Sequence, residues 1–364
     1  MSTEGKFAII CITENGKSLA FKINEKLPHS HIYLVKNKKN NLTNDGINSN
    51  DFLTEKKVSE LVGYLFSDYQ YILFIMATGI VVRTIAPYIV SKFSDPAILV
   101  TDEKGTNIIS LLSGHMGGAN EMTNYISELI GANPVITTAT DVNKKSSLDM
   151  ISKKLNAYID DFRENVKDVN AMLVNNQDVG IYVDGDYKVD TRGFNVLNNL
   201  DELSNFEKVV IISNRNKINE IDLKSLEKNK FIKVVPKDIV LGIGCRRDTE
   251  SQLLKESLKK FLDKNNINEN AIKLIGSIDV KKNEKAIIDL SKYLDVEFRV
   301  FSKDEISEVD YLYDKSEFVK ANVGVYCVAE PVAHILSNGN LIIEKNTYKG
   351  ITFSVGRIDI WYML

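Results

Sequence analysis

Short apolar runs alternate with amphipathic stretches over the first third of the chain. The runs at 7–13, 31–36 and 71–76 predict buried β-strands, and the stretches near 16–26 and 53–66 predict helices between them. Strands that alternate with helices assemble into parallel or mixed sheets whose faces the helices cover. The pattern therefore predicts an α/β fold in this part of the chain.

The same alternation continues to about residue 138, and the polar, asparagine-rich segment 37–51 predicts a loop. The most apolar stretch, 71–90, is divided by Thr78-Gly79 and contains Arg83, so its apolar parts are shorter than the roughly 20 residues of a membrane-spanning helix. We therefore expect no membrane association. The further elements expected are a helix over 80–93, strands over 97–101, 107–112 and 134–138, a turn over 102–105 and a helix from His115 to about Ile130.

Two changes in the pattern predict a multi-domain chain. Residues 140–236 are rich in Asn, Asp and Lys and predict only short strands. A strong apolar strand returns at 239–243, and a helix follows that Asp248 or Thr249 caps and that runs to about Asp263. We expect mostly parallel or mixed sheets flanked by helices in an N-terminal α/β domain over 1–137 and a C-terminal α/β domain over 237–364, joined by a small α/β middle region over 138–236.

Composition and charge exclude several classes of protein. The chain has 364 residues, is 44% hydrophobic and carries a formal net charge of −3, whereas a nucleic-acid partner usually requires a basic face. Cys11, Cys245 and Cys327 are far apart and form no CxxC pair, so we expect neither a zinc site nor a disulfide framework. Isolated thiols, together with an N-terminus that lacks a signal-peptide pattern, predict a cytoplasmic protein.

Three predicted strand-to-helix junctions combine glycine with side chains that bind or react. In open α/β sheets, ligands bind outside the carboxyl ends of the strands, and the planar fork of arginine matches a carboxylate. We therefore expect the three junctions to line one cleft for a ligand that carries several carboxylates. The expected contributors are Thr78, Gly79 and Arg83 at the first junction, His115, Gly117, Gly118 and Asn120 at the second, and Gly244, Arg246 and Arg247 at the third.

Neither glycine-rich junction matches a nucleotide-binding motif. GHMGGAN (114–120) lacks the Lys-Ser/Thr of a P-loop, and GIGCRR (242–247) lacks the third glycine of GxGxxG. A nucleotide-dependent enzyme is therefore disfavoured.

Structural explanations stay open for these candidates. A junction glycine often serves only backbone conformation or close packing, an arginine at a helix start can be solvated or ion-paired, and His115 can simply brace its turn. His29 and His31 lie two residues apart, a spacing that can hold a metal, but no further ligands accompany them and we expect no metal site. We expect His334 and Cys245 to be structural groups packed among apolar residues.

Together the motifs resemble the cobalt-precorrin 5A hydrolase family, CbiG, of anaerobic cobalamin biosynthesis. Both ends of the chain carry the resemblance in the expected order, and the middle corresponds to the family's variable central region. The chain departs from the family pattern at His334, where the family favours small apolar residues, and this argues against a catalytic role for His334. The matching segments are ATGIVVRTIAPYIVSKFSDPAILVTDEKG (77–105), ISLLSGHMGGAN (109–120), LGIGCRRDT (241–249), SIDVKKNE (277–284) and VAEPVAHIL (328–336).

The resemblance implies a hydrolase that opens the δ-lactone on the A ring of a cobalt-bearing tetrapyrrole. The exposed C20 unit then leaves as acetaldehyde, and cobalt-precorrin 5B remains. Because the cobalt arrives with the substrate, we expect no cofactor and no protein-bound metal. A flat ligand of this size suits a cleft between the N- and C-terminal domains, and we expect at most transient contact with other enzymes of the pathway.

This chemistry assigns roles to the candidate residues. A water must be activated near pH 7, which suits His115 as a general base. The tetrahedral oxyanion needs preorganised donors, which the N–H groups of Gly117 and Gly118 can supply at a helix start. The acetate and propionate arms of the ring need cations, and the candidates are Arg83, Arg246, Arg247 and Lys281.

A non-catalytic corrinoid carrier is the alternative from another functional class. It would use the same arginines and glycines but would not need His115 as a base. Release of acetaldehyde from the substrate distinguishes the two functions.

Overall fold

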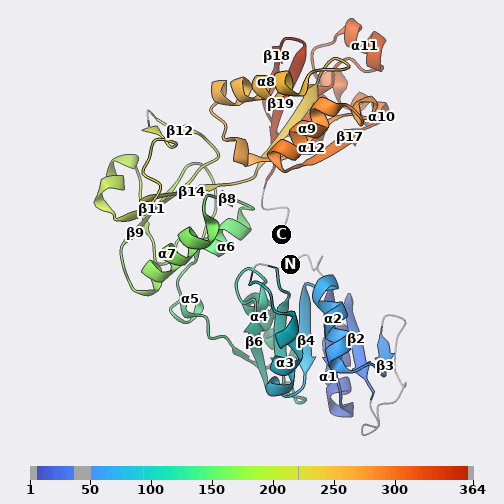
Figure 1. Cartoon of the computed structure of the whole chain (residues 1–364), viewed down its shortest axis with the longest axis vertical. Helices are drawn as coiled ribbons and strands as arrows, with labels where there is room; N and C mark the ends of the chain where they lie inside the picture. The colour runs from blue at the N-terminus through green and yellow to red at the C-terminus, as the bar shows by residue number, and fades with distance from the viewer. Residues whose placement is uncertain (1–5, 37–50, 93, 220, 360–364) are drawn as a thin grey trace. The chain divides into compact units, whose positions relative to one another are not determined.

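The chain forms two compact units, Met1–Lys145 and Ser146–Leu364 (Figure 1). The first unit contains one sheet, and the second contains two five-stranded sheets and a two-stranded ribbon. The α/β class is confirmed, whereas the division into three domains at 137/138 and 236/237 stays a prediction. No helix in the part of the chain that the structure describes is long and apolar enough to cross a membrane. The structure, a computed structural model, describes residues 6–36, 51–92, 94–219 and 221–359.

The sheet of the first unit reverses strand direction once. Its strands lie in the order β3-β2-β1-β4-β5-β6-β7, and the first five run parallel. β6 pairs antiparallel with β5, which places Leu112 opposite Ile98 and Ile108 opposite Thr101, and β7 then runs parallel to β6. The strands are β1 (Phe7–Cys11), β2 (Ser30–Val35), β3 (Phe52–Thr54), β4 (Tyr71–Ile75), β5 (Ala97–Thr101), β6 (Asn107–Leu112) and β7 (Asn133–Val135).

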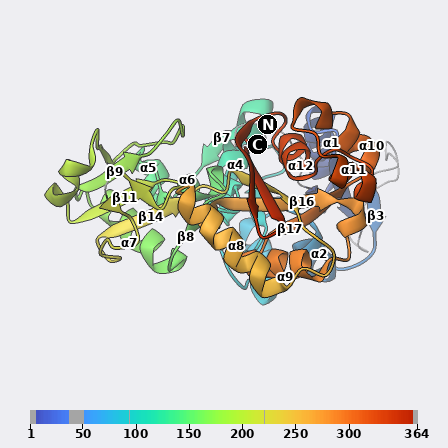
Figure 2. The same ribbon diagram turned by 90° about the horizontal axis from the view of Figure 1, so that it is seen from above.

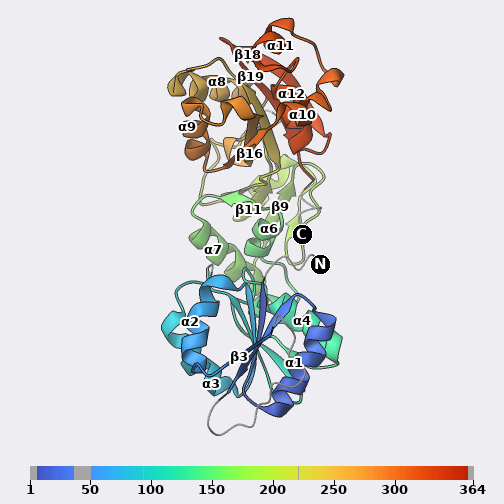
Figure 3. The ribbon, with the colours of Figure 1, turned by 90° about the vertical axis from the view of Figure 1, so that its right-hand side faces the viewer.

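Helices cover both faces of this sheet (Figure 3). α1 and α4 pack on one face, where Ile23 and Ile126 are fully buried, and α2 and α3 pack on the other through Val62 and Val81. Each helix thus buries one apolar stripe against the strands, as its periodicity predicts. The helices are α1 (Glu14–Lys26), α2 (Val58–Asp68), α3 (Thr78–Ile85), α4 (Ala119–Ile130) and the short α5 (Ala139–Val142).

The helix predicted over 80–93 is shorter than expected. It begins at Thr78 and ends at Ile85, and a 3₁₀ turn, η1 (Ala86–Tyr88), follows. Pro87 lies in this turn and has no N–H with which to continue the α-helical ladder, so the helix ends before it.

The first sheet of the second unit lies within the predicted middle region. Its order is β10-β9-β11-β14-β8, and only β8 pairs antiparallel. Val210 and Ile212 of β11 face α6 and α7, while Val209 and Ile211 face the opposite layer around η2. The elements are α6 (Leu148–Lys154), β8 (Tyr158–Ile159), α7 (Phe162–Val174), β9 (Val179–Val183), β10 (Asn195–Val196), η2 (Leu200–Asn205), β11 (Lys208–Ile212), the ribbon β12 (Lys217–Ile218) and β13 (Ile221–Asp222), and β14 (Phe231–Val235).

The second sheet has the order β17-β16-β15-β19-β18, with β15, β16 and β17 parallel and β19 antiparallel to β15. α8 and α9 cover one face, and α12 covers the other (Figure 2). The elements are β15 (Ile239–Gly244), α8 (Ser251–Lys264), η3 (Glu269–Ala271), β16 (Ile272–Ile278), η4 (Asp279–Lys281), α9 (Lys285–Leu294), β17 (Glu297–Phe301), α10 (Lys303–Ser307), η5 (Asp310–Leu312), α11 (Glu317–Val323), α12 (Ala329–Leu336), β18 (Leu341–Tyr348) and β19 (Ile351–Arg357).

The N-cap predicted for α8 is wrong by one or two residues. The cap is Glu250, which makes no side-chain capping bond. Asp248 instead adopts a left-handed backbone at φ 57°, and the Thr249 hydroxyl donates to the carbonyl of Arg246. Both side chains predicted to cap the helix therefore belong to the turn before it.

Gly242→Ala is expected to destabilise the second unit, because the added Cβ would lie 1.8 Å from the carbonyl oxygen of Ala329 and would push α12 away from β15. Overpacking of this kind costs about 1–3 kcal/mol or more. In the control Gly79→Ala, the nearest neighbour of the new Cβ is the flexible end of Arg83, at 3.3 Å, so the melting temperature should not fall. Thermal unfolding followed by circular dichroism compares the two variants, and equal melting temperatures would contradict the close packing of α12.

Candidate functional site

The strand reversal in the first unit creates a separate edge where β6 and β7 end. Because β6 is antiparallel to β5, its carboxyl end lies at the edge of the sheet where β4 and β5 begin. β7 runs parallel to β6, so the segments 113–118 and 136–142 leave the sheet at this same edge. We call it the β6–β7 edge.

A compact glycine turn connects β6 to α4 at the β6–β7 edge. Ser113 adopts a left-handed backbone at φ 57°, and the N–H groups of Ala119 and Asn120 donate to the carbonyls of Ser113 and Gly114. A Cβ on Gly117 would lie 2.4 Å from the Cβ of Ser113, so the turn closes only around glycine. His115 lies between Ser113 and Gly117 in the sequence, so the close contact of these two residues restricts its position.

The glycine turn also explains why the helix predicted from His115 starts late. Gly118, at φ 88°, is the N-cap of α4, and the helix begins at Ala119. The N–H of Gly118 donates to the carbonyl of His115 at 3.0 Å, so this predicted oxyanion donor already has an acceptor. Within the described parts of the chain, the N–H of Gly117 donates to no other group, and its role toward an oxyanion stays a prediction.

His115 contacts two side chains of the segment that follows β7. Its Nε2 lies 3.0 Å from Oδ2 of Asp141 and 2.9 Å from Oγ1 of Thr140. The His115 side chain is 18% exposed and that of Asp141 is 42% exposed, so the pair lies at the surface without being fully solvated. A histidine held by a carboxylate at a strand end is an arrangement that suits proton transfer.

Asn120 is buried at the start of α4, and its amide hydrogen-bonds to Asp141 and to two neighbouring hydroxyl groups. Its Nδ2 donates to Oδ2 of Asp141 at 3.0 Å and to Oγ1 of Thr138 at 2.8 Å, and its Oδ1 accepts from the Ser110 hydroxyl at 2.6 Å. Only 6% of Asn120 is exposed. These protein contacts occupy its amide, so the geometry favours a structural role for Asn120 over the substrate-binding role predicted from the sequence.

The first predicted junction lies at the other edge of the same sheet. Thr78 and Gly79 follow the carboxyl end of β4, opposite the β6–β7 edge. The prediction that 77–83 and 113–120 line one cleft is therefore wrong, because β6 runs against β4 and β5. The third junction belongs to the second unit, and its share in a substrate site stays a prediction.

A cavity of about 530 Å³ lies beside Thr78, where β1, β4 and β5 end. Asp102 and Glu103 line it, but no lysine, arginine or histidine is among its described lining residues. Glu103 accepts from Thr13 and Asn15 at 3.0 and 3.2 Å. Burial would raise the pKa of Asp102, yet hydrogen bonds from the backbone N–H groups of Lys104, Thr106 and Asn107 and from the Thr106 hydroxyl outweigh this effect and lower that pKa. The cavity therefore suits an uncharged, apolar group better than a carboxylate arm.

Arg83 lies in the last turn of α3 and is exposed. Its Nη1 donates to the carbonyl of Gly79 at 2.9 Å, within the same helix. Its predicted contact with a carboxylate arm of a substrate stays a prediction.

The third junction lies at the carboxyl edge of the β15–β16 pair in the second unit. Gly244 ends β15, and Lys281 follows the parallel β16, so these residues share an edge of the sheet. Arg246 and Arg247 are exposed, and no ion pair joins either of them to the described residues. Two exposed, unpaired guanidinium groups at a strand end suit anionic groups of a ligand.

Lys281 is a weaker candidate than the two arginines. Its Nζ lies 2.9 Å from Oε2 of Glu284, and the two side chains are 11% and 9% exposed. This ion pair already balances the lysine charge. Burial raises the pKa of Cys245 although Lys281 opposes the shift, so Cys245 is a neutral structural thiol, as expected.

His334 and His31 each form a hydrogen bond with a tyrosine hydroxyl. Nδ1 of His334 hydrogen-bonds the hydroxyl of Tyr313 at 2.7 Å, which fits the structural role expected for it. His31 pairs through Nδ1 with the hydroxyl of Tyr69. Among the described residues, no three His, Cys, Asp or Glu side chains gather as a metal site would require.

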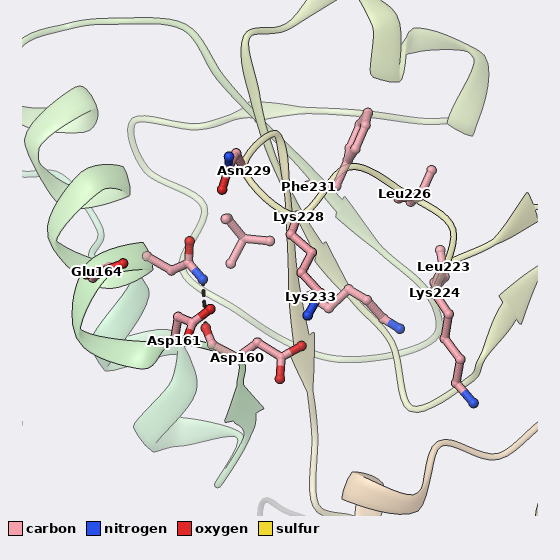
Figure 4. Close-up of a pocket in the computed structure, with 12 residues that line it drawn as sticks. Asp160, Asp161, Glu164, Leu223, Lys224, Leu226, Lys228, Asn229, Phe231 and Lys233 are labelled. Atoms are coloured by element: carbon pink, nitrogen blue, oxygen red, sulfur yellow. Dashed lines mark hydrogen bonds between the residues drawn. The ribbon is translucent and has the colours of Figure 1, made fainter.

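A second cavity, of about 330 Å³, lies in the second unit near β14. Figure 4 shows Asp160 and Asp161 on one side of it and Lys228 and Lys233 on the other. Burial and the nearby Lys224 lower the pKa of Lys233. The residues come from two distant segments without a motif, which is why the sequence did not indicate this cavity.

Comparison with known proteins places the chain in a family. The chain is 38% identical over 355 residues to a cobalt-precorrin-5A hydrolase from Salmonella typhimurium, which covers 96% of this chain and 97% of that relative. The chain belongs to the cobalamin synthesis G family. The matching family models are "Cobalamin synthesis G N-terminal" over 60–141, "Cobalamin biosynthesis central region" over 146–221 and "Cobalamin synthesis G C-terminus" over 239–356.

Two further proteins also match nearly the whole chain. A cobalt-precorrin-5A hydrolase from Priestia megaterium is 28% identical over 98% of this chain and 96% of its own length. The crystal structure of a cobalamin biosynthesis protein G homolog from Sulfolobus solfataricus is 23% identical, covers 97% of both chains and has a TM-score of 0.41. All five segments that carried the resemblance in the sequence fall inside the N-terminal and C-terminal family matches, so the resemblance is confirmed.

Sequence reasoning missed the side chains that surround His115. Asp141 and Thr140 follow the strand that was predicted over 134–138, and Ser110 lies inside a predicted strand. The available indication was the polar run TTATD at 137–141, directly after a strand end. Without the direction of β6 and β7, nothing linked that run to His115.

Asn120→Asp is expected to destabilise the first unit by about 1–3 kcal/mol, because it replaces a donor to Asp141 with a second carboxylate in a buried position. The control Asn133→Asp alters an exposed amide that donates to Asn107, and it should change stability by less than about 0.5 kcal/mol. Chemical denaturation at pH 7 compares the two variants. Equal midpoints for both variants would show that the Asn120 amide does not hold the β6–β7 edge together.

Proposed function

We propose that this chain is a cobalt-precorrin-5A hydrolase. It opens the δ-lactone of cobalt-precorrin 5A and releases acetaldehyde to give cobalt-precorrin 5B. The observation that carries the proposal is the 38% identity to the Salmonella typhimurium enzyme of that name over 96% of this chain. The cobalt enters with the tetrapyrrole as part of the substrate.

In this proposal the reaction takes place at the β6–β7 edge, with His115 as general base. A water adds to the lactone carbonyl carbon and transfers a proton to the imidazole. The tetrahedral oxyanion accepts a hydrogen bond from the N–H of Gly117. The ring C–O bond then breaks, and the departing oxygen takes the proton back and becomes a hydroxyl on C20. This hydroxyl loses its proton and becomes the aldehyde C=O as the C–C bond between C20 and the macrocycle breaks, so that acetaldehyde leaves while the macrocycle keeps the electron pair and takes up a proton.

Arg246 and Arg247 bind carboxylate arms of the tetrapyrrole rather than take part in bond breaking. Their exposure and the absence of ion pairs to described residues support this role. Lys281 is a secondary candidate because Glu284 already neutralises it. Arg83 is an additional candidate cation for the first unit.

We also propose a cytoplasmic location, because Cys11, Cys245 and Cys327 are free thiols, which fits a reducing compartment. The tetrapyrrole is the ligand, and neither nucleic acid nor a membrane is a partner. Contacts with other enzymes of the same biosynthesis would be transient.

The purified chain is expected to release one acetaldehyde per cobalt-precorrin 5A in single-turnover experiments, and His115→Asn should lower the rate by about 10² to 10⁴. The variant should still fold and bind the tetrapyrrole, which thermal melting and the visible absorption of the cobalt complex test. If the wild-type chain binds the tetrapyrrole without releasing acetaldehyde, the alternative of a corrinoid carrier is correct. A folded His115→Asn variant with the wild-type rate and pH dependence would remove His115 from the mechanism.

Arg246→Ala and Arg247→Ala are each expected to weaken substrate binding by about 1.5–3 kcal/mol if the contact is charge-assisted and desolvated. Turnover at saturating substrate should largely survive, because neither group takes part in bond breaking. Lys349→Ala, which removes a cation from the nearby β18–β19 turn, is the control and should change KM little. A variant with normal KM and a collapsed kcat would contradict a binding role.

A further inference from the structure

We propose that Lys233 is a reactive amine that captures acetaldehyde as an imine in the cavity beside β14. The choice of aldehyde rests on the proposed function, because that reaction releases acetaldehyde. Three observations carry the inference. Lys233 lines the cavity of about 330 Å³, its side chain is half-buried, and no ion pair joins it to a carboxylate in the described part of the chain.

The alternation of side chains along β14 places Lys233 beside an apolar surface. Ile232 and Val234 pack with α6 and α7 on one face of the sheet, so Phe231 and Lys233 point to the opposite face. Phe231 packs there with the buried Leu223, and both residues also line the cavity. A small aldehyde that enters the cavity therefore finds apolar surface for its methyl group near the amine.

The charges around Lys233 favour its neutral form. Burial lowers the pKa of Lys233, and the positive charge of Lys224 lowers it further, while Asp160 and Asp222 oppose the shift without reversing it. Figure 4 shows Lys233 in the cavity wall together with Lys224, Lys228 and Asp160.

A neutral amine is the form of lysine that attacks a carbonyl group. An exposed lysine with the ordinary pKa is neutral in only about one molecule in 10³ near pH 7.4. A half-buried lysine without an ion pair is neutral more often, and the cavity gives a small molecule access to it. Burial and access thus occur together at Lys233.

The reaction needs no oxidant or reductant. The lone pair of the neutral amine forms a C–N bond to the carbonyl carbon, and the carbonyl oxygen takes up a proton to become the hydroxyl of a carbinolamine. The nitrogen loses its two protons in the course of the reaction, and the hydroxyl leaves as water. The product is a C=N imine between Lys233 and the two-carbon unit, and water reverses the reaction.

Reductive trapping tests the reactivity without the tetrapyrrole. The full chain is incubated with ¹³C-labelled acetaldehyde and sodium cyanoborohydride, and peptide mass spectrometry measures N-ethylation at each lysine over time. Lys233 should be ethylated about 3- to 10-fold faster than two matched controls in the same unit. Lys228 lines the same cavity but is exposed, and Lys273 is half-buried with a pKa that burial lowers but does not line this cavity.

Two variants test the charges around the amine in opposite directions. Lys224→Ala removes the positive charge that lowers the pKa of Lys233, so ethylation of Lys233 should slow by about 2- to 5-fold. Asp160→Asn removes a negative charge that raises this pKa, so ethylation should become faster by a similar factor. Ethylation of Lys273 should stay at the wild-type rate in both variants, and circular dichroism checks that both are folded.

The outcomes separate this inference from the proposed function. Ethylation of Lys233 no faster than that of Lys228 or Lys273 would overturn the reactive amine, even if the chain is an active hydrolase. Folded variants in which Lys224→Ala and Asp160→Asn leave the rate at Lys233 unchanged would also overturn it. If Lys233 is ethylated selectively by added acetaldehyde while the chain releases none from cobalt-precorrin 5A, the proposed function fails and the reactive amine stands.

Discussion

The antiparallel pairing of β6 with β5 is the constraint on which the arrangement of the first unit depends. Five parallel strands would send every following loop to one edge of the sheet, where α/β proteins collect their ligand-binding groups. The reversal at β6 sends the loops after β6 and β7 to the opposite edge instead. One sheet therefore carries two separate strand-end regions with different chemistry.

The two regions differ in the groups that they present. The edge beside Thr78 has an apolar cavity whose two carboxylates are bound by the protein's own donors. The β6–β7 edge holds a histidine, a carboxylate, hydroxyls and an amide within hydrogen-bond distance of one another. Proton transfer requires the second set of groups, which is why the proposed chemistry is assigned to the β6–β7 edge.

The alternation of strands and helices was predictable from the sequence, because buried strands and amphipathic helices leave different periodicities. Periodicity did not reveal the direction of β6, since the pattern of a buried strand is the same in both directions. A usable indication was nevertheless present: only residues 102–106 connect β5 to β6, whereas a parallel connection needs a dozen residues or more.

The late start of α4 followed from the left-handed backbone of Gly118, a conformation that a glycine in the sequence permits but does not require. His115 was identified from its glycine cluster, while Asp141 became recognisable only once β6 and β7 were known to end together.

The position of the cobalt shows whether the tetrapyrrole reacts at the β6–β7 edge. Crystals of the full-length His115→Asn variant, soaked with cobalt-precorrin 5A, would give anomalous scattering from the metal. We predict a cobalt peak closer to residue 115 than to Thr78, with the lactone facing Asp141 and the glycine turn. A cobalt peak at the apolar cavity beside Thr78, with the lactone turned away from residue 115, would contradict it.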